Sequence, residues 1–211
     1  MKIGEMQRVL SHKAAQESAY QFRNLYYLLY NDDWLRAAHA HVRHNTGSNT
    51  PGVDGLTMRA FDAHVEENLA TLRDTLRTKQ FVPAPVRRVY IPKANGKTRP
   101  LGIASITDRI VQEALRMILE PIWEADFSRH SYGFRPNRST KDALAYLGVR
   151  LTGPAGKTYQ WVIEGDITSY YDTIPRRPLM KRVRRRIGDD DLCHLLQQFL
   201  RAGVLEQGTY H

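Results

Sequence analysis

The sequence predicts an α+β fold in which most of the chain is helical. In several segments apolar residues recur at the three- and four-residue spacing of amphipathic helices. Two strand-like arms, 86–92 and 98–103, flank the pair Asn95-Gly96, which tolerates the positive φ of a tight hairpin turn. A further strand-like run begins at Val162 and ends at the carboxylate of Asp166. Helices, one hairpin and one apolar strand together indicate this class.

Length and charge limit the range of functions. The chain has 211 residues, enough for one large domain or for one and a half small ones. Its net charge of +9 favours a polyanionic partner, most often nucleic acid, with an anionic membrane surface as the alternative. No apolar run approaches the roughly 20 residues that span a bilayer, so we expect no integral membrane protein. The N-terminus lacks the apolar core of a signal peptide. One cysteine, Cys193, excludes an internal disulfide and fits a reducing compartment.

The first half of the chain predicts three helices. Residues 14–30 carry an aromatic stripe at four-residue spacing, typical of a helix face. The letters from Tyr30 to Trp34 match the Tyr-x-Asp-Asp signature of polymerases, but they lie between two helical patterns. Asp32 or Asp33 therefore fits an N-cap better, with His39 and His41 at the surface of the helix that follows. The turn-rich stretch 46–55 leads to Thr57, the predicted cap of one long helix.

The second half begins with a helix at 108–120, which Pro121 should end or kink. Ser139, with Asp142 three residues later, resembles another helix start. The three aspartates 189–191 should begin a last helix, and Gly203 should cap its C-terminus. Nothing after that helix predicts a closing element.

Three basic segments are candidates for nucleic-acid contacts, and each has a plainer alternative. The hairpin, with Arg87, Arg88, Lys93, Lys97 and Arg99, could bind phosphates or could be an edge kept soluble by charge. The loop 131–139 combines Arg135 and Arg138 with Tyr132 and Phe134, which suits base stacking or a structural loop with buried rings. The run 181–186, including Arg182 and Arg185, suits a nucleic-acid backbone or a solvated helix face.

Asp166 is the candidate metal ligand. A carboxylate at the end of a strand is a good ligand for Mg²⁺, and two-metal nucleotidyl transfer needs such a residue. Taken alone, the pattern favours an aspartate that ends a strand or caps the next helix, because Asp often serves as an N-cap.

Six sequence blocks occur together and in order, and they carry a resemblance. They are Asn49–Gly55, Tyr90–Lys93, Asn95–Ile103, Asp108-Arg109, Ser131–Pro136 and Glu164–Ile167. From about Asn24 onward the chain resembles bacterial group II intron reverse transcriptases, the intron-encoded maturase proteins. The resemblance implies a right-hand polymerase, with an N-terminal extension at 1–23, helical fingers at 24–157 and the first part of the palm at 158–211.

The resemblance also implies roles for particular residues. Asp166 would be the first catalytic aspartate and would bind two Mg²⁺ ions. The backbone carbonyl of Ile167 would complete the coordination shell of one of these ions. Lys93 and Arg99 would hold the triphosphate of the incoming dNTP. Tyr170 would lie under the sugar, although the family usually has Phe-Phe where this chain has Tyr170-Tyr171. Implied partners are an RNA template, such as intron RNA, and a DNA or RNA primer.

The chain departs from the family in what it lacks. The Pro-Gln-Gly block and the Tyr-x-Asp-Asp hairpin of the family are missing. We therefore expect the parent protein to be an RNA-directed DNA polymerase and this piece to be inactive alone, through natural truncation or otherwise. The alternative is a maturase module that binds intron RNA without DNA synthesis. Apolar surface left uncovered would favour self-association. The expected location is the bacterial cytoplasm, with an organelle as the alternative.

Overall fold

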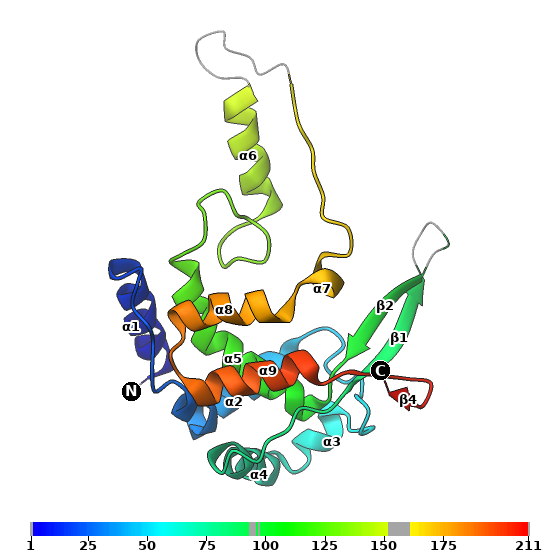
Figure 1. Cartoon of the computed structure of the whole chain (residues 1–211). Helices are drawn as coiled ribbons and strands as arrows, with labels where there is room; N and C mark the ends of the chain where they lie inside the picture. The colour runs from blue at the N-terminus through cyan, green and yellow to red at the C-terminus, as the bar shows by residue number, and fades with distance from the viewer. Residues whose placement is uncertain (1, 93–95, 97, 152–160, 211) are drawn as a thin grey trace.

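The computed structural model describes residues 2–92, 96, 98–151 and 161–210, and it confirms the α+β class. Within these residues the helices are interrupted by one pair of short strands after Arg77 and followed by a second pair after Arg201 (Figure 1). The helices are α1 Ile3–Gln16, η1 Tyr26–Tyr30, α2 Asp32–His44, α3 Met58–Asp62, α4 Val65–Arg77, α5 Ile106–Glu124, α6 Thr140–Leu151, α7 Tyr170–Thr173, α8 Arg176–Arg186 and α9 Asp190–Arg201. The strands are β1 Val86–Pro92, β2 Thr98–Ile103, β3 Val204–Glu206 and β4 Thr209–Tyr210.

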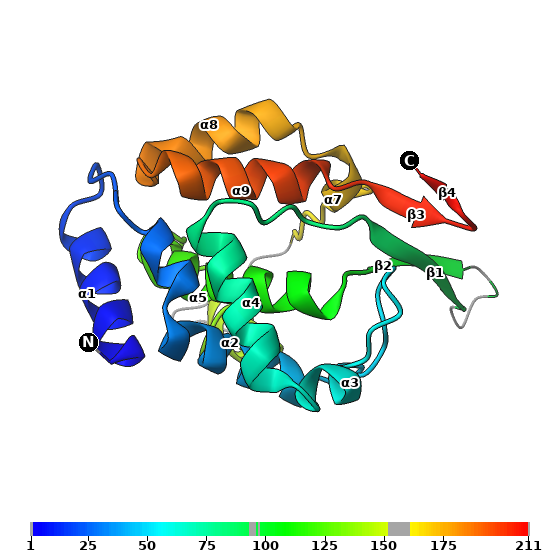
Figure 2. The same cartoon turned by 90° about the horizontal axis from the view of Figure 1, so that it is seen from below.

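Helix α5 forms the centre of the hydrophobic core, with α1, α2 and η1 packed around it (Figure 2). Its cap is Ser105, whose hydroxyl accepts from the Asp108 amide. Ile110, Ala114 and Ile118 are completely buried, as the four-residue spacing predicts. Pro121 lies inside the helix, which continues to Glu124. Of the two predicted effects of Pro121, an end of the helix is therefore wrong, and a kink stays a prediction.

The single helix predicted for residues 14–30 is also wrong. Helix α1 ends at Gln16, and the backbone of Phe22 instead bridges to Ile187. The Phe22 amide donates to the Arg186 carbonyl at 2.7 Å, and the Phe22 carbonyl accepts from the Gly188 amide at 2.7 Å. The aromatic stripe is therefore divided between this bridge and η1. Hydrogen bonds to a distant segment here replace those a continuous helix would have made.

Helix α2 is capped by Asn31, not by Asp32 or Asp33, which occupy its first turn. The Asn31 side chain accepts from the Trp34 amide at 3.1 Å. Both aspartates still lie where they interact favourably with the helix dipole. His39 is buried and not at the surface as predicted, because α3 covers it and places Asp62 Oδ1 2.7 Å from its Nε2.

The helix that begins after Thr57 is two helices, α3 and α4, and Thr57 is the predicted cap of the first. Ser139 and Asp142 form the predicted helix start at α6, since the Asp142 amide donates to Ser139 Oγ. Asp189 caps α9, and Gly203 follows that helix with φ of 74°, as a C-terminal glycine should.

The strands form one mixed sheet in the order β2-β1-β3-β4. The predicted hairpin is present: β1 and β2 are antiparallel, with Arg87 opposite Ile103 and Ile91 opposite Arg99. Strand β3 then pairs with β1 in parallel, Val86 opposite Val204. The expectation that nothing closes the chain after α9 is therefore wrong, since β3 and β4 extend the sheet.

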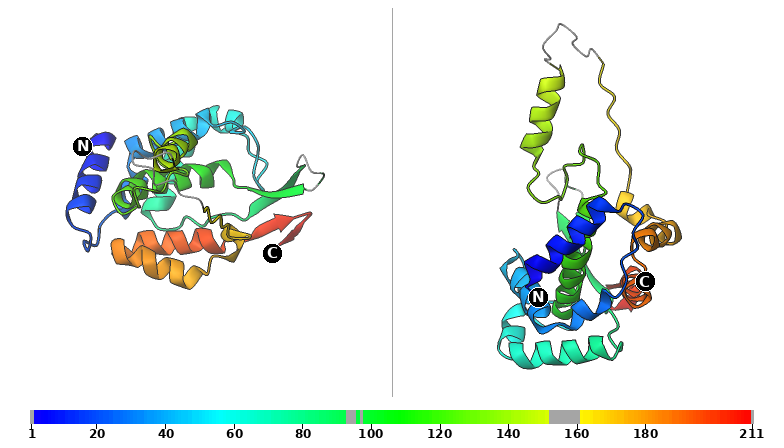
Figure 3. Two further views of the ribbon diagram at one scale, coloured as in Figure 1. Left: turned by 90° about the horizontal axis from the view of Figure 1, so that it is seen from above. Right: turned by 90° about the vertical axis from the view of Figure 1, so that its left-hand side faces the viewer.

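Helix α6 projects away from the rest of the molecule, and the segment 161–168 returns beside it (Figure 3). No residue of α6 is buried. Among the residues that the structure describes, no helix is both long and apolar enough to cross a membrane.

Candidate nucleotide and nucleic-acid site

The basic hairpin presents Arg99 to solvent. Arg99 lies opposite Ile91 in the ladder, and its side chain is exposed. Arg87, Val89 and Ile91 alternate along β1 on one face, and Arg88 and Tyr90 point to the other. Lys93 lies outside the described residues. The hairpin thus holds Arg99 on a rigid two-stranded support, which is the geometry expected of a cation that binds phosphate.

Arg87 has a structural partner that the sequence did not reveal. Its Nε and Nη2 donate to the carbonyl of Pro51 at 3.2 and 2.8 Å. This guanidinium therefore binds a carbonyl of the loop 46–55, and the structure does not support the prediction that it contacts nucleic acid. Arg88 is half-buried, and its Nε has no hydrogen-bond partner among the described residues.

Tyr90 connects the hairpin to the end of the chain. Its hydroxyl donates to Glu206 Oε1 at 2.5 Å, and this hydrogen bond raises the pKa of Tyr90. The bond joins β1 to β3 beyond the two residue pairs of their ladder. The orientation of the hairpin therefore depends on β3, an element that the sequence did not predict.

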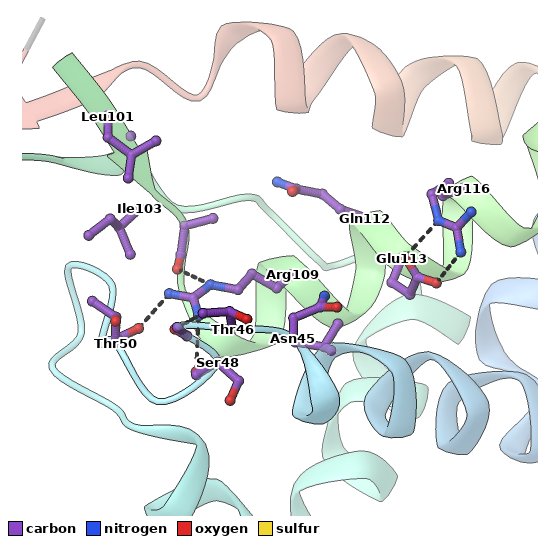
Figure 4. A pocket seen from close by; sticks show the side chains of 14 residues that line it. Asn45, Thr46, Ser48, Thr50, Leu101, Ile103, Arg109, Gln112, Glu113 and Arg116 are labelled. Carbon is purple, nitrogen blue, oxygen red and sulfur yellow. Dashed lines mark hydrogen bonds and ion pairs between the residues drawn. The ribbon is translucent and has the colours of Figure 1, made fainter. Parts of the chain in front are cut away.

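Arg109 organises a cavity of about 550 Å³ between the loop 45–50, β2 and α5 (Figure 4). Its guanidinium donates to the carbonyls of Ala104, Ser48 and Thr50, at 2.9, 3.0 and 2.5 Å. Gly52 lets the same loop approach closely, because a Cβ there would lie 2.6 Å from the Ser105 backbone. The turn-rich loop is therefore a fixed wall of this cavity.

Asp166 lies on an exposed, extended segment, and the strand predicted to deliver it is absent among the described residues. The side chains of Val162 and Ile163 are 79% and 99% exposed. A strand needs a neighbour for its amide and carbonyl groups, and no described strand lies beside this segment. Ile167 and Tyr170 follow it, both exposed, and the Tyr170 ring makes an edge contact with Tyr171 at 5.4 Å.

The described residues do not by themselves fit a magnesium centre. Within them there is no group of three or more His, Cys, Asp or Glu side chains able to hold a metal ion. Asp166 supplies one exposed carboxylate, whereas Mg²⁺ requires near-octahedral oxygen coordination. Among the described residues Asp166 therefore belongs to no cluster of three or more side chains able to hold a metal ion.

Arg135 is buried, and this corrects its assignment as a nucleic-acid contact. Its Nε and Nη2 donate to the Glu124 carboxylate at about 3 Å, and Nη1 donates to the carbonyls of Ser128 and Ser131. Arg138 likewise donates to the carbonyls of Arg129 and Ser131. These hydrogen bonds hold the loop in place, as in the structural alternative. The expectation that its rings are buried is wrong for Phe134, which is fully exposed.

The arginines of the basic run on helix α8 differ in burial and in ion pairing. Arg186 is buried, and Arg184 pairs with Asp190 at 2.6 Å. Arg182 and Arg185 are exposed and have no ion-pair partner in the part of the chain that the structure describes. These two arginines, with Arg99, are the predicted nucleic-acid or nucleotide contacts that remain available.

The family profile and the individual proteins that this chain resembles agree with one another. A family profile described as reverse transcriptase (RNA-dependent DNA polymerase) matches residues 91–210. Protein YkfC of Escherichia coli is 45% identical over 210 residues, which cover 100% of this chain and 55% of that protein. Group II intron-encoded protein LtrA of Lactococcus lactis is 37% identical over 191 residues, 90% of this chain and 31% of that protein. Nuclear intron maturase 2 of Arabidopsis thaliana is 30% identical over 148 residues, 64% of this chain and 20% of that protein.

The chain spans about half of YkfC and less than a third of LtrA. The family profile covers more than half of this chain, including β2, α5 and the Asp166 segment. The chain belongs to the reverse transcriptase family, among the group II intron reverse transcriptases and maturases.

Proposed function

We propose that the protein is the fingers and the first part of the palm of an RNA-directed DNA polymerase. The fingers are residues 24–157, the palm begins at 158, and residues 1–23 are an extension. One observation carries the proposal: the reverse transcriptase profile matches residues 91–210, which include both the exposed Arg99 of the hairpin and the exposed Asp166. Cations that bind a triphosphate and carboxylates that bind its metal ions are the groups that nucleotidyl transfer needs.

In this proposal Arg99 and Lys93 bind the triphosphate of the dNTP, and Tyr170 lies under its sugar. Asp166 supplies one carboxylate to Mg²⁺, and the carbonyl of Ile167 supplies another oxygen. Because the described residues contain no group of three or more His, Cys, Asp or Glu side chains able to hold a metal ion, the other ligands of two Mg²⁺ ions have to come from elsewhere. The chain alone is therefore expected to bind nucleic acid and not to extend a primer.

Intron RNA is the proposed template, with a DNA or RNA primer. The net charge of +9 and the exposed Arg182 and Arg185 support a polyanionic partner. The same arginines favour the second candidate, a maturase role in which the protein binds intron RNA and aids splicing without DNA synthesis.

The test compares Asp166→Asn with Glu164→Gln, which removes a carboxylate two residues away on the same exposed segment. RNA binding is measured by fluorescence anisotropy, and primer extension on an RNA template is measured with Mg²⁺. In a polymerase that contains this chain, Asp166→Asn should abolish extension and leave RNA affinity unchanged, while Glu164→Gln should retain both. Equal loss of extension in both variants would contradict the role of Asp166. Retained extension in Asp166→Asn would refute the catalytic role of Asp166, whereas RNA binding without extension by the unsubstituted protein would favour the maturase role.

Self-association is a further proposal, supported by the exposed Trp161, Val162 and Ile163. Analytical ultracentrifugation should show a concentration-dependent dimer. A monomer that does not bind an apolar dye would refute it.

A further inference from the structure

A groove of about 960 Å³ runs between the turn 18–21, the C-terminal part of α5 and α8. Its lining residues come from α5, α8 and α9, from two residues just after α5 and from the turn after α1. The lining is mainly apolar: Leu119, Trp123, Phe127, Leu179, Val183 and Leu196. It lies on α5 and α8 and contains neither the hairpin nor Asp166, so it is separate from the nucleotide site.

One wall of this groove is fixed in place by Arg186. Its Nη1 donates to the carbonyls of Glu17, Ser18 and Tyr20 at 2.8, 2.9 and 3.1 Å. From the same wall, Gln21 Nε2 donates to the Arg184 carbonyl at 2.8 Å. The groove is therefore formed before any ligand arrives, which reduces the ordering cost of binding.

The charge of the groove is positive. Arg182 and Arg185 lie at its edge, exposed and without an ion-pair partner among the described residues. The one carboxylate in its lining, Asp126, is neutralised by Arg186, whose Nε lies 2.8 Å from Asp126 Oδ2. A ligand in this groove would therefore be expected to carry negative charge.

The apolar part offers aromatic surface next to that charge. Phe127 is 49% exposed, and the Arg135 guanidinium lies over its ring at 5.2 Å. Trp123 lies one helical turn earlier in the chain and is partly buried. An exposed ring supported by a fixed cation, with two free arginines nearby, matches the arrangement that binds a stacked base and its phosphates.

We infer that this groove binds unpaired RNA nucleotides, with a base stacked on Phe127 and phosphates on Arg182 and Arg185. The inference rests on the proposed function, because it assigns a particular form of RNA to the predicted basic surface of α8. Duplex RNA keeps its bases stacked inside the helix and cannot place one on Phe127, so the groove should prefer loops, bulges or single strands. An acidic apolar peptide is the competing ligand.

The test uses fluorescence anisotropy with the full chain and two labelled RNAs: an unstructured single strand and a blunt duplex that contains the same strand. Phe127→Leu keeps the apolar volume but removes the ring. It should weaken single-strand binding roughly fivefold or more, as loss of one stacked base does. Duplex binding should not change, and Phe127→Tyr should restore the wild-type affinity.

A second variant tests phosphate binding by the two arginines independently of stacking on the Phe127 ring. Arg182→Gln with Arg185→Gln should reduce the slope of log affinity against log salt for the single strand by about 1.4, or 0.7 for each phosphate released. The control is Arg59→Gln with Arg201→Gln, which removes two exposed arginines that do not line the groove. This control should leave the slope unchanged.

The outcomes separate this inference from the proposed function. If the wild type binds single-stranded RNA but the groove variants and the control behave alike, the groove is not the site and only this inference fails. If the wild type binds neither RNA, both proposals fail. If an acidic apolar peptide displaces the single strand from wild type but the Phe127 variants leave RNA affinity unchanged, the groove is a protein site and the inference is overturned.

Discussion

Replacing Arg186 with Met should destabilise the protein strongly. The guanidinium is 5% exposed and donates to four carbonyls, including that of Ala14 at 3.0 Å, and to Asp126. Met keeps much of the apolar volume but leaves these acceptors and one carboxylate without their donor. Unpaired buried acceptors and the loss of one partner of a buried ion pair are both costly.

The expected magnitude is limited by partial access to water. Asp126 keeps 30% of its side-chain surface exposed, and the carbonyls of the turn 17–20 are only partly buried. We therefore expect a loss of about 3 kcal/mol in the free energy of unfolding, at the lower end of the range for a broken buried pair. For a chain of this length that corresponds to a decrease in Tm of roughly 10 °C.

The measurement is urea unfolding followed by circular dichroism, with calorimetry for Tm. Arg185→Met is the matched control, since it changes the neighbouring residue, which is exposed and unpaired in the described structure. It should stay within about 0.5 kcal/mol of wild type. Arg186→Lys should be intermediate, because Lys restores the charge but not the planar set of donors. If Arg186→Met and Arg185→Met are equally stable, the hydrogen bonds of Arg186 do not stabilise the fold as we argue.

Three further changes test other parts of the fold. Gly52→Ala should lower the free energy of unfolding by about 1–3 kcal/mol, because its Cβ would lie 2.6 Å from the Ser105 backbone; Gly133→Ala, with open space around it, is the control in the same denaturation assay. Burial raises the pKa of Asp108 in the folded state, so the ionised carboxylate is destabilising at neutral pH and protonation relieves this as pH falls through the folded pKa. The stability of wild type relative to Asp108→Asn should therefore increase from pH 7 towards pH 4 in urea titrations, and a constant difference would refute this. Burial also raises the pKa of the Cys193 thiol, which is completely buried, so it should react with a thiol reagent only in denaturant; rapid labelling of the native protein would contradict the packing.

Much of the fold followed from local patterns. The positions of the hairpin, of the core face of α5 and of the caps Thr57 and Asp189 were predictable, because each depends on residues a few positions apart. The family followed from six blocks in order. The roles of Lys93, Arg99, Asp166, Ile167 and Tyr170 remain predictions that depend on that resemblance.

The arginines show why the site was harder to predict. Arg87, Arg135, Arg138 and Arg185 look alike in sequence, yet the first three donate to carbonyls of loops and only the last is free to bind a ligand. The carbonyl that accepts from Arg87 is 36 positions away, and the four carbonyls that accept from Arg186 are more than 160 positions away. No pattern within one helix or strand contains that information.

The sequence by itself determined the class, the family and most helix positions, since periodicity and caps act within one or two turns. Only the tertiary structure decided that residues 17–25 leave the helix, that β3 joins β1, and that the Asp166 segment forms no strand. The physical reason is the same in each case. Backbone donors and acceptors take whichever partners the packed chain brings near them, and here those partners come from distant segments or are not present among the described residues.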